Sequence, residues 1–256
     1  RFTSAGNRLL NLADQTLPLV HSAELDLQRL AGGESGRIYM AIECHSCFEW
    51  LLPAIDTYRN EWADVELDIA SGFHFAPLPA LARGDLDLVI TADPVDEPGI
   101  HYFPLFSYEA KLAVAKDHEL VAKEWAEPQD LVEETIISYP VDRDRLDLFT
   151  SFLDPAEVEP AQTRHAELTT MIVQLVASGR GVACLPNWAL HEYLQNDYLS
   201  VRSLGEEGVW PTLYGAVRAD QADAPFMLGF VDVAKDVCFK NLKGIVTAEL
   251  EPLKFR

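Results

Sequence analysis

The sequence has few basic residues, few cysteines and no long apolar run. Only 20 Lys and Arg stand against 41 Asp and Glu in 256 residues, so the formal net charge is −21. Because non-specific affinity for nucleic acid comes mostly from Lys and Arg, this charge argues against the chain itself binding a phosphate backbone. Four cysteines are too few for a disulfide scaffold. No apolar run approaches the roughly 20 residues of a membrane-spanning helix.

The start of the chain lacks two further features. No charged and then apolar leader precedes a small-residue cleavage site, which predicts a cytoplasmic location. The first residue is Arg1 rather than Met, so we expect a segment upstream of it. Hydrophobic residues nevertheless make up 48% of the chain, which is enough to bury a core in one large domain or two small ones.

Recognisable catalytic motifs are also lacking. No G-x-S-x-G elbow places a nucleophile, and no H-E-x-x-H pattern provides a metalloprotease site. Gly179-Arg180-Gly181 follows a predicted helix and precedes a predicted strand, which is the reverse of a dinucleotide-binding loop. We therefore expect no enzyme activity, no cofactor and no metal.

Apolar residues in 7–30 recur at spacings of three, four and seven, which predicts a helix. Pro18 interrupts this pattern and should kink the helix, because it lacks the N–H that would bond one turn back. A glycine-rich stretch at 31–36 ends the helix. An apolar stripe without an adjoining fold predicts pairing with the same helix of a second subunit.

The residues that follow predict two α/β units. Strands at 38–42, 65–69 and 86–90 enclose helices at 47–58 and 77–84, and this order favours a parallel sheet. A second series has predicted strands at 111–115, 135–138, 182–185 and 212–217, and predicted helices at 146–153, 168–178, 188–196 and 226–237. Two lobes joined by two crossing strands, one of them 111–115, fit this order better than one continuous sheet. Ligands of such folds bind beyond the carboxyl ends of the strands, here in the cleft between the lobes.

Several segments resemble the LysR-type transcriptional regulators. They are 2–6, at the end of the family's winged helix-turn-helix, Gly36-Arg37-Ile38, Leu51-Leu52-Pro53-Ala54-Ile55, 81–88 and 175–186. The resemblance implies two Rossmann-like lobes of the type 2 periplasmic-binding-protein kind, preceded by a linker helix. It assigns 1–36 to the end of the wing and the linker helix, 37–108 with 215–256 to lobe I, and 109–214 to lobe II.

A closer resemblance is to the homocysteine-responsive activators of methionine biosynthesis within that family. The matching residues are 41–47, Trp50-Leu51, 71–73 and 139–141, followed by a turn with Arg143 and Arg145. This resemblance implies a cytoplasmic activator that senses homocysteine and acts as a homodimer or homotetramer. It also implies DNA binding through a winged helix-turn-helix upstream of Arg1, and RNA polymerase as a further partner.

The candidate effector-binding residues follow the predicted strands or carry the family match. They are Cys44, His45, Ser46, Cys47, Phe73, His74, Thr91, Asp93, Tyr139, Thr169, Thr170 and Pro186. In the family, the loop after the first strand lines the effector pocket. The Ser46 hydroxyl and the amides at this predicted helix N-terminus would bind a carboxylate. Asp93 or Glu43 could hold the ammonium group of the ligand.

Cys44-His45-Ser46-Cys47 also supports two other interpretations. A C-x-x-C at a helix N-terminus is typical of a thiol oxidoreductase, since the helix dipole favours the thiolate. Glu43, however, stands where such proteins usually have an aromatic residue. A metal site would lack an obvious fourth ligand. Ligand contact therefore ranks first, redox chemistry second and metal binding third, and a solute-binding protein of similar shape is a further alternative.

Overall fold

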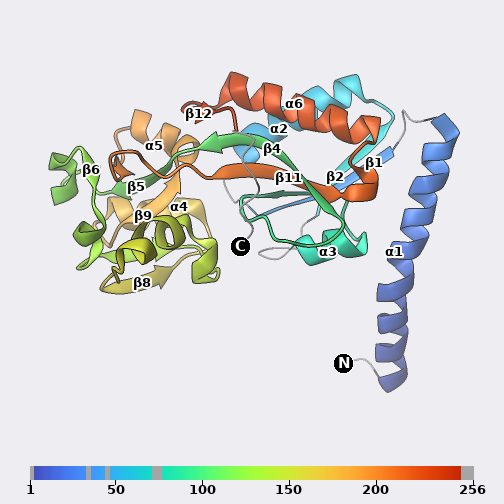
Figure 1. Ribbon diagram of the computed structural model, residues 1–256, viewed down its shortest axis with the longest axis horizontal. Coiled ribbons are helices and arrows are strands. Elements are labelled where there is room, and N and C mark those ends of the chain that lie inside the picture. Colours follow the sequence, from blue (N-terminus) through green and yellow to red (C-terminus); the bar gives the residue numbers. More distant parts are fainter. Residues whose placement is uncertain (1–2, 33–35, 44–46, 71–76, 249–256) are drawn as a thin grey trace.

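The computed structural model describes residues 3–32, 36–43, 47–70 and 77–248. Helix α1 (Ser4–Gly32) stands apart beside the two lobes (Figure 1) and includes Pro18. The helix predicted at 7–30 is therefore confirmed. Its leucines at 9, 12, 17 and 27 are exposed. Within the described residues, no helix combines the length and the apolar character needed to cross a membrane.

Within the described residues, the larger lobe is built on a six-stranded sheet with the order β12-β4-β11-β3-β1-β2. Its strands are β1 (Gly36–Ile42), β2 (Val65–Ile69), β3 (Leu88–Thr91), β4 (Ile100–Tyr108), β11 (Thr212–Arg218) and β12 (Ile245–Val246). Strands β1, β2 and β3 are parallel, as predicted. The other strands pair antiparallel, because β4 leaves for the smaller lobe and β11 returns from it.

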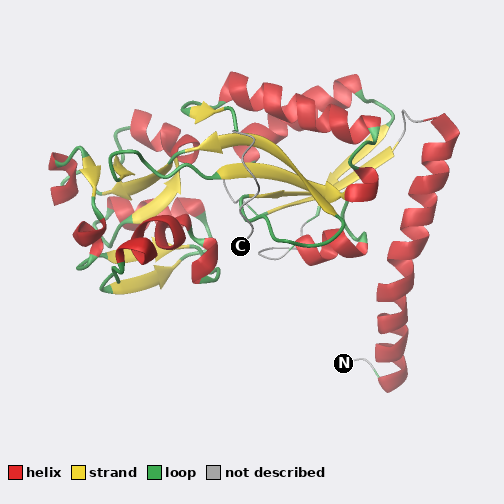
Figure 2. Ribbon diagram, in the orientation of Figure 1, coloured by secondary structure: helices red, strands yellow, loops and turns green. Residues whose placement is uncertain are grey.

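Helices cover both faces of this sheet (Figure 2). Helices α2 (Phe48–Glu61) and α6 (Pro225–Asn241) share one core with one face, and α3 (Leu78–Arg83) packs on the other. The fully buried Tyr58 of α2 contacts the Phe230 ring of α6, with ring centroids 5.4 Å apart. The Tyr58 hydroxyl donates to the Phe226 carbonyl at 2.7 Å. These contacts hold the two helices together over the sheet.

The smaller lobe repeats the strand order of the larger one. In the described part of the chain its strands are β5 (Ala110–Val114), β6 (Trp125–Ala126), β7 (Thr135–Ser138), β8 (Gln162–His165), β9 (Ala183–Pro186) and β10 (Ser200–Leu204). Strand β7 lies beside Val182, which leads into β9, because the Ile137 amide donates to the Val182 carbonyl at 2.8 Å. The order β8-β7-β9-β5-β10 therefore has three parallel strands followed by two antiparallel ones, like β2-β1-β3-β11-β4.

The two connections between the lobes run side by side. The Tyr108 amide donates to the Pro211 carbonyl at 3.0 Å, and the Ala110 amide donates to the Val209 carbonyl at 2.8 Å. The crossing thus comes just before β5, and the prediction that 111–115 itself crosses is wrong. Leu112 and Val114 are fully buried in the smaller lobe, which explains why this apolar segment forms a central strand there.

The remaining segments of the smaller lobe depart from the predicted lengths. The segment predicted as a helix at 146–153 forms one π-helical turn, Leu148–Leu153. Helix α4 (Thr169–Ala177) lies where 168–178 is predicted. The helix predicted at 188–196 is split into a 3-10 turn, Asn187–Leu190, and α5 (His191–Gln195).

Candidate functional site

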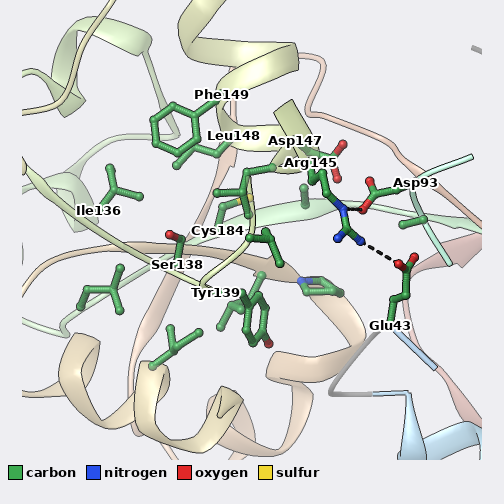
Figure 3. Close-up of a pocket in the computed structure, with 18 of the residues that line it drawn as sticks. Glu43, Asp93, Ile136, Ser138, Tyr139, Arg145, Asp147, Leu148, Phe149 and Cys184 are labelled. Atoms are coloured by element: carbon green, nitrogen blue, oxygen red, sulfur yellow. Dashed lines mark hydrogen bonds and ion pairs between the residues drawn. The ribbon is translucent and has the colours of Figure 1, made fainter. Parts of the chain in front are cut away.

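A pocket of about 150 Å³ opens between the two lobes (Figure 3). The larger lobe contributes Glu43, Ala92 and Asp93, which follow strands β1 and β3. The smaller lobe contributes the apolar part of the wall, chiefly Ile136, Ile137, Leu148, Phe149, Ile172 and Leu185. Since its wall comes from both lobes, any ligand that fills the pocket contacts both.

The ends of β1 and β3 bring the two acidic side chains together. The Glu43 amide donates to the Ile90 carbonyl at 3.0 Å, which keeps the end of β1 beside β3. The buried Thr91 hydroxyl donates to the Glu43 carboxylate, and its oxygen accepts from the Asp93 amide at 2.9 Å. Thr91 therefore fixes both residues without itself facing the described pocket wall.

Arg145 of the smaller lobe reaches across the pocket to both carboxylates. It ends the 3-10 turn Arg143–Arg145. Its Nη2 lies 2.8 Å from Glu43 Oε1, and its Nε lies 3.1 Å from Asp93 Oδ2 (Figure 3). The three side chains are only 23%, 9% and 17% exposed, in the order Arg145, Glu43, Asp93. We call these three residues the inter-lobe ion bridge.

Burial dominates the electrostatics of this bridge. Loss of solvation raises the pKa of Glu43 above its ordinary value of 4.5, and the charge of Asp93 raises it further. The hydrogen bond from Thr91 and the charge of Arg145 act in the opposite direction. The mouth of the pocket thus holds two carboxylates close to one guanidinium, so it favours an additional positive charge.

The interior of the pocket is apolar and contains a thiol. Cys184 of β9 is a free cysteine on the pocket wall. Burial raises the pKa of its thiol, so the group stays protonated at neutral pH. A protonated thiol is a soft, weakly polar wall rather than a nucleophile. On the same wall, the Tyr139 hydroxyl and Thr169 Oγ1 share a hydrogen bond of 2.7 Å.

The structure brings only some of the predicted site residues to this pocket. Asp93, Tyr139 and Pro186 line it, and Thr91 and Thr169 bond to lining residues. Thr170 is exposed on α4, outside the described lining. Cys47 is buried in the core of the larger lobe, where it is disulfide-bonded. Cys44, His45, Ser46, Phe73 and His74 lie outside the described residues. Effector contact stays a prediction for the whole set.

Sequence reasoning missed several lining residues from the smaller lobe. Leu148 and Phe149 belong to the π-helical turn, and Cys184 belongs to β9. Arg145 was noted only as part of a basic turn, since no local pattern reveals a partner 102 positions away. Among the described residues, no three His, Cys, Asp or Glu side chains gather as a metal site.

Comparison with known proteins identifies this architecture. The chain matches the model of the LysR substrate binding domain over residues 31–239, and it belongs to this family of transcriptional regulators. It is 41% identical to the HTH-type transcriptional regulator MetR of Escherichia coli K12 over 249 residues, which cover 97% of this chain and 77% of the relative. Identity to MetR of Haemophilus influenzae is 40% over 250 residues, 98% of this chain and 81% of that protein.

A solved structure shows the same fold. The regulatory domain of MetR from Neisseria meningitidis, described as a LysR family regulator, has 39% sequence identity and a TM-score of 0.75 to this chain. The match covers 83% of this chain and 98% of that domain. The chain is thus a MetR-like member of the family and contains its effector-binding domain.

Proposed function

We propose that this chain is the sensing part of an activator of methionine-biosynthesis genes, and that it binds homocysteine in the inter-lobe pocket. The resemblance of 41–47 and 139–141 to homocysteine-responsive activators supports the ligand. Relatives named MetR at about 40% identity support the regulatory role. The single observation that carries the proposal is the division of the pocket into a charged mouth and an apolar interior.

Homocysteine matches both parts of this pocket. It has an ammonium and a carboxylate group at one end and a short thiol-bearing chain at the other. A cavity of about 150 Å³ admits a molecule of the size of benzene, so the thiol-bearing chain fits the interior while the charged end stays in the mouth. The protonated thiol of Cys184 suits a sulfur-bearing chain, since it offers a polarisable contact and does not react with it.

Binding would be coupled to the relative position of the two lobes. Strands β1–β4, β11 and β12 belong to one lobe, and β5–β10 belong to the other. A ligand shifts this two-lobed arrangement only by its difference in affinity between two states. The pocket provides that difference, because Glu43 and Asp93 come from one lobe and Arg145 with most of the apolar wall comes from the other, so the full set of contacts needs both lobes in place.

The response would reach DNA through a helix-turn-helix outside the described residues, since the net charge of −21 disfavours DNA binding by this part. The relatives are named HTH-type regulators. The exposed leucines of α1 provide a stripe for pairing with a second copy, which makes the regulator a homo-oligomer. A regulator of genes acts where the DNA lies, here the cytoplasm.

Calorimetric titration with homocysteine tests the proposal. The wild-type chain should bind homocysteine and should not bind glycine, which lacks the thiol-bearing chain. Ala92→Leu places a larger side chain in the pocket wall and should weaken homocysteine binding by at least about tenfold. Ala219→Leu makes the same change on the exposed surface of the larger lobe and should leave affinity unchanged. Absence of any heat with the wild-type chain, or equal affinities of the two variants, would overturn the proposal.

A further inference from the structure

The inter-lobe ion bridge has more negative than positive charge. Glu43 and Asp93 each bond to the same guanidinium, that of Arg145, through different nitrogens. All three groups are at least three-quarters buried, so water screens their charges weakly and each favours a ligand group of opposite sign. A further carboxylate, that of Asp147, also lines the pocket. A ligand that brought only a carboxylate would add to this excess, whereas a ligand that brings a cation reduces it.

The guanidinium of Arg145 also stands at the boundary between the lobes. It belongs to a short 3-10 turn of the smaller lobe, whereas both of its acceptors belong to the larger lobe. Figure 3 shows it directed from the turn toward the two carboxylates, with Leu148 and Phe149 on the side of Arg145 away from those carboxylates. An ion pair that spans this boundary breaks or re-forms when the two lobes move relative to each other.

We propose that an amino-acid ligand binds by exchange with this bridge, so that its ammonium group takes the place of Arg145 between Glu43 and Asp93 and its carboxylate pairs with the released guanidinium. This inference rests on the proposed function and assigns the orientation of the ligand. It places the carboxylate on Arg145 rather than on Ser46. The exchange leaves the net charge of the site unchanged, because one cation and one anion enter together.

The exchange explains how a small ligand could act on both lobes. Without ligand, the two lobes are joined by direct ion pairs from Arg145. With ligand, the same charges are joined through the α-carbon of the amino acid, which lengthens the link and fixes its geometry. The site then selects α-amino acids by their two charges, and the apolar interior selects among them by side chain. Simple thiol-bearing acids and simple amines each satisfy only half of the mouth.

Two analogues of homocysteine isolate the two charges. The first is 4-sulfanylbutanoate, which lacks the ammonium group, and the second is 3-aminopropane-1-thiol, which lacks the carboxylate. In calorimetric titrations of the wild-type chain with a phosphine reductant throughout, each should bind at least about tenfold more weakly than homocysteine. This comparison needs no variant, so a folding defect cannot obscure it.

Variants then assign each charge to its partner. In the double variant with Glu43→Gln and Asp93→Asn, the analogue without the ammonium group should bind less than about threefold more weakly than homocysteine. The analogue without the carboxylate should still bind at least about tenfold more weakly. Arg145→Gln should show the opposite pattern. Arg83→Gln removes an exposed ion pair on α3 and should behave as the wild type. Thermal unfolding of each variant confirms that it is folded.

The outcomes separate this inference from the proposed function. If homocysteine gives no heat with the wild-type chain, both fail. If homocysteine binds but 4-sulfanylbutanoate binds equally well, the exchange is refuted and the proposed function stands. The exchange is also refuted if each analogue binds more weakly than homocysteine by the same factor in every variant, because the two charges of the ligand would then have no specific partners in the protein.

Discussion

Replacement of Arg145 by Gln should destabilise the ligand-free protein far more than the same change at Arg83. Arg145 bonds to two carboxylates whose side chains are 9% and 17% exposed. Removing one partner of a fully buried pair costs about 3–5 kcal/mol, whereas exposed pairs contribute about 0–1 kcal/mol. The bridge is partly exposed, so we expect a loss of about 2–3 kcal/mol. Arg83 and its partner Asp85 are 58% and 27% exposed, and their loss should cost less than about 1 kcal/mol.

The pH dependence of this loss has a definite sign. Burial already raises the pKa of Glu43, and Arg145 is one of the groups that lower it. Without Arg145 the pKa of Glu43 in the folded protein rises further above its value in the unfolded chain. A carboxyl group with a raised folded-state pKa stabilises the fold fully below the unfolded pKa, and this contribution is lost as the pH rises through the folded pKa. The deficit of Arg145→Gln should therefore be largest at neutral pH and should shrink toward pH of about 4.

Urea unfolding followed by circular dichroism measures both quantities. The wild type, Arg145→Gln and Arg83→Gln would be compared at neutral pH and at several lower values, with the slope of each transition checked for equality. Equal losses for the two variants would refute the argument from burial. A deficit of Arg145→Gln that does not change with pH would refute the assignment of the loss to unpaired carboxylates.

Three further predictions concern other parts of the molecule. Gly181→Ala should destabilise the smaller lobe strongly, since Gly181 has a φ of +141° and an added Cβ would lie 2.2 Å from the Thr135 carbonyl oxygen; thermal unfolding measures this, and an unchanged midpoint would contradict it. Leu17→Glu places a charge in the exposed apolar stripe of α1 and should shift the chain toward monomer in sedimentation velocity; an unchanged sedimentation coefficient would contradict pairing through this stripe. Burial raises the pKa of the Cys184 and Cys238 thiols, so iodoacetamide should label neither in the native protein at neutral pH, as mass spectrometry would show; rapid labelling would exclude this burial.

The elements with a periodic apolar pattern could be predicted from the sequence. Residues 65–69 and 135–138 match β2 and β7 to the residue, and Gly84 caps α3 with a φ of +83°, as its position after the helix suggests. Strand β8 was missed because all four of its residues are exposed, so no apolar alternation marks it. Strand β4 was also missed, although it is the longest strand of the larger sheet and pairs with β11 over most of its length.

The candidate site was predictable only where residues follow strands. Asp93 and Tyr139 were identified because parallel strands end at the same edge of a sheet. Arg145 and Phe149 could not be identified in this way, because they lie on short irregular turns whose position depends on the packing of the whole smaller lobe. The contact between Arg145 and Glu43 joins residues of two lobes, and only the assembled fold determines it.

The matching strand orders of the two lobes explain why the pocket has two unlike ends. Strands β1 and β3 of the larger lobe correspond in order to β7 and β9 of the smaller lobe. Glu43 and Asp93 follow the first pair, whereas Tyr139 follows β7 and Pro186 ends β9. Equivalent strand ends thus present carboxylates from one side and largely apolar groups from the other. An amino acid has the same division between its charged end and its side chain, so a ligand of this class can satisfy both lobes at once, and Arg145 is the residue of the smaller lobe that joins the two halves of the site.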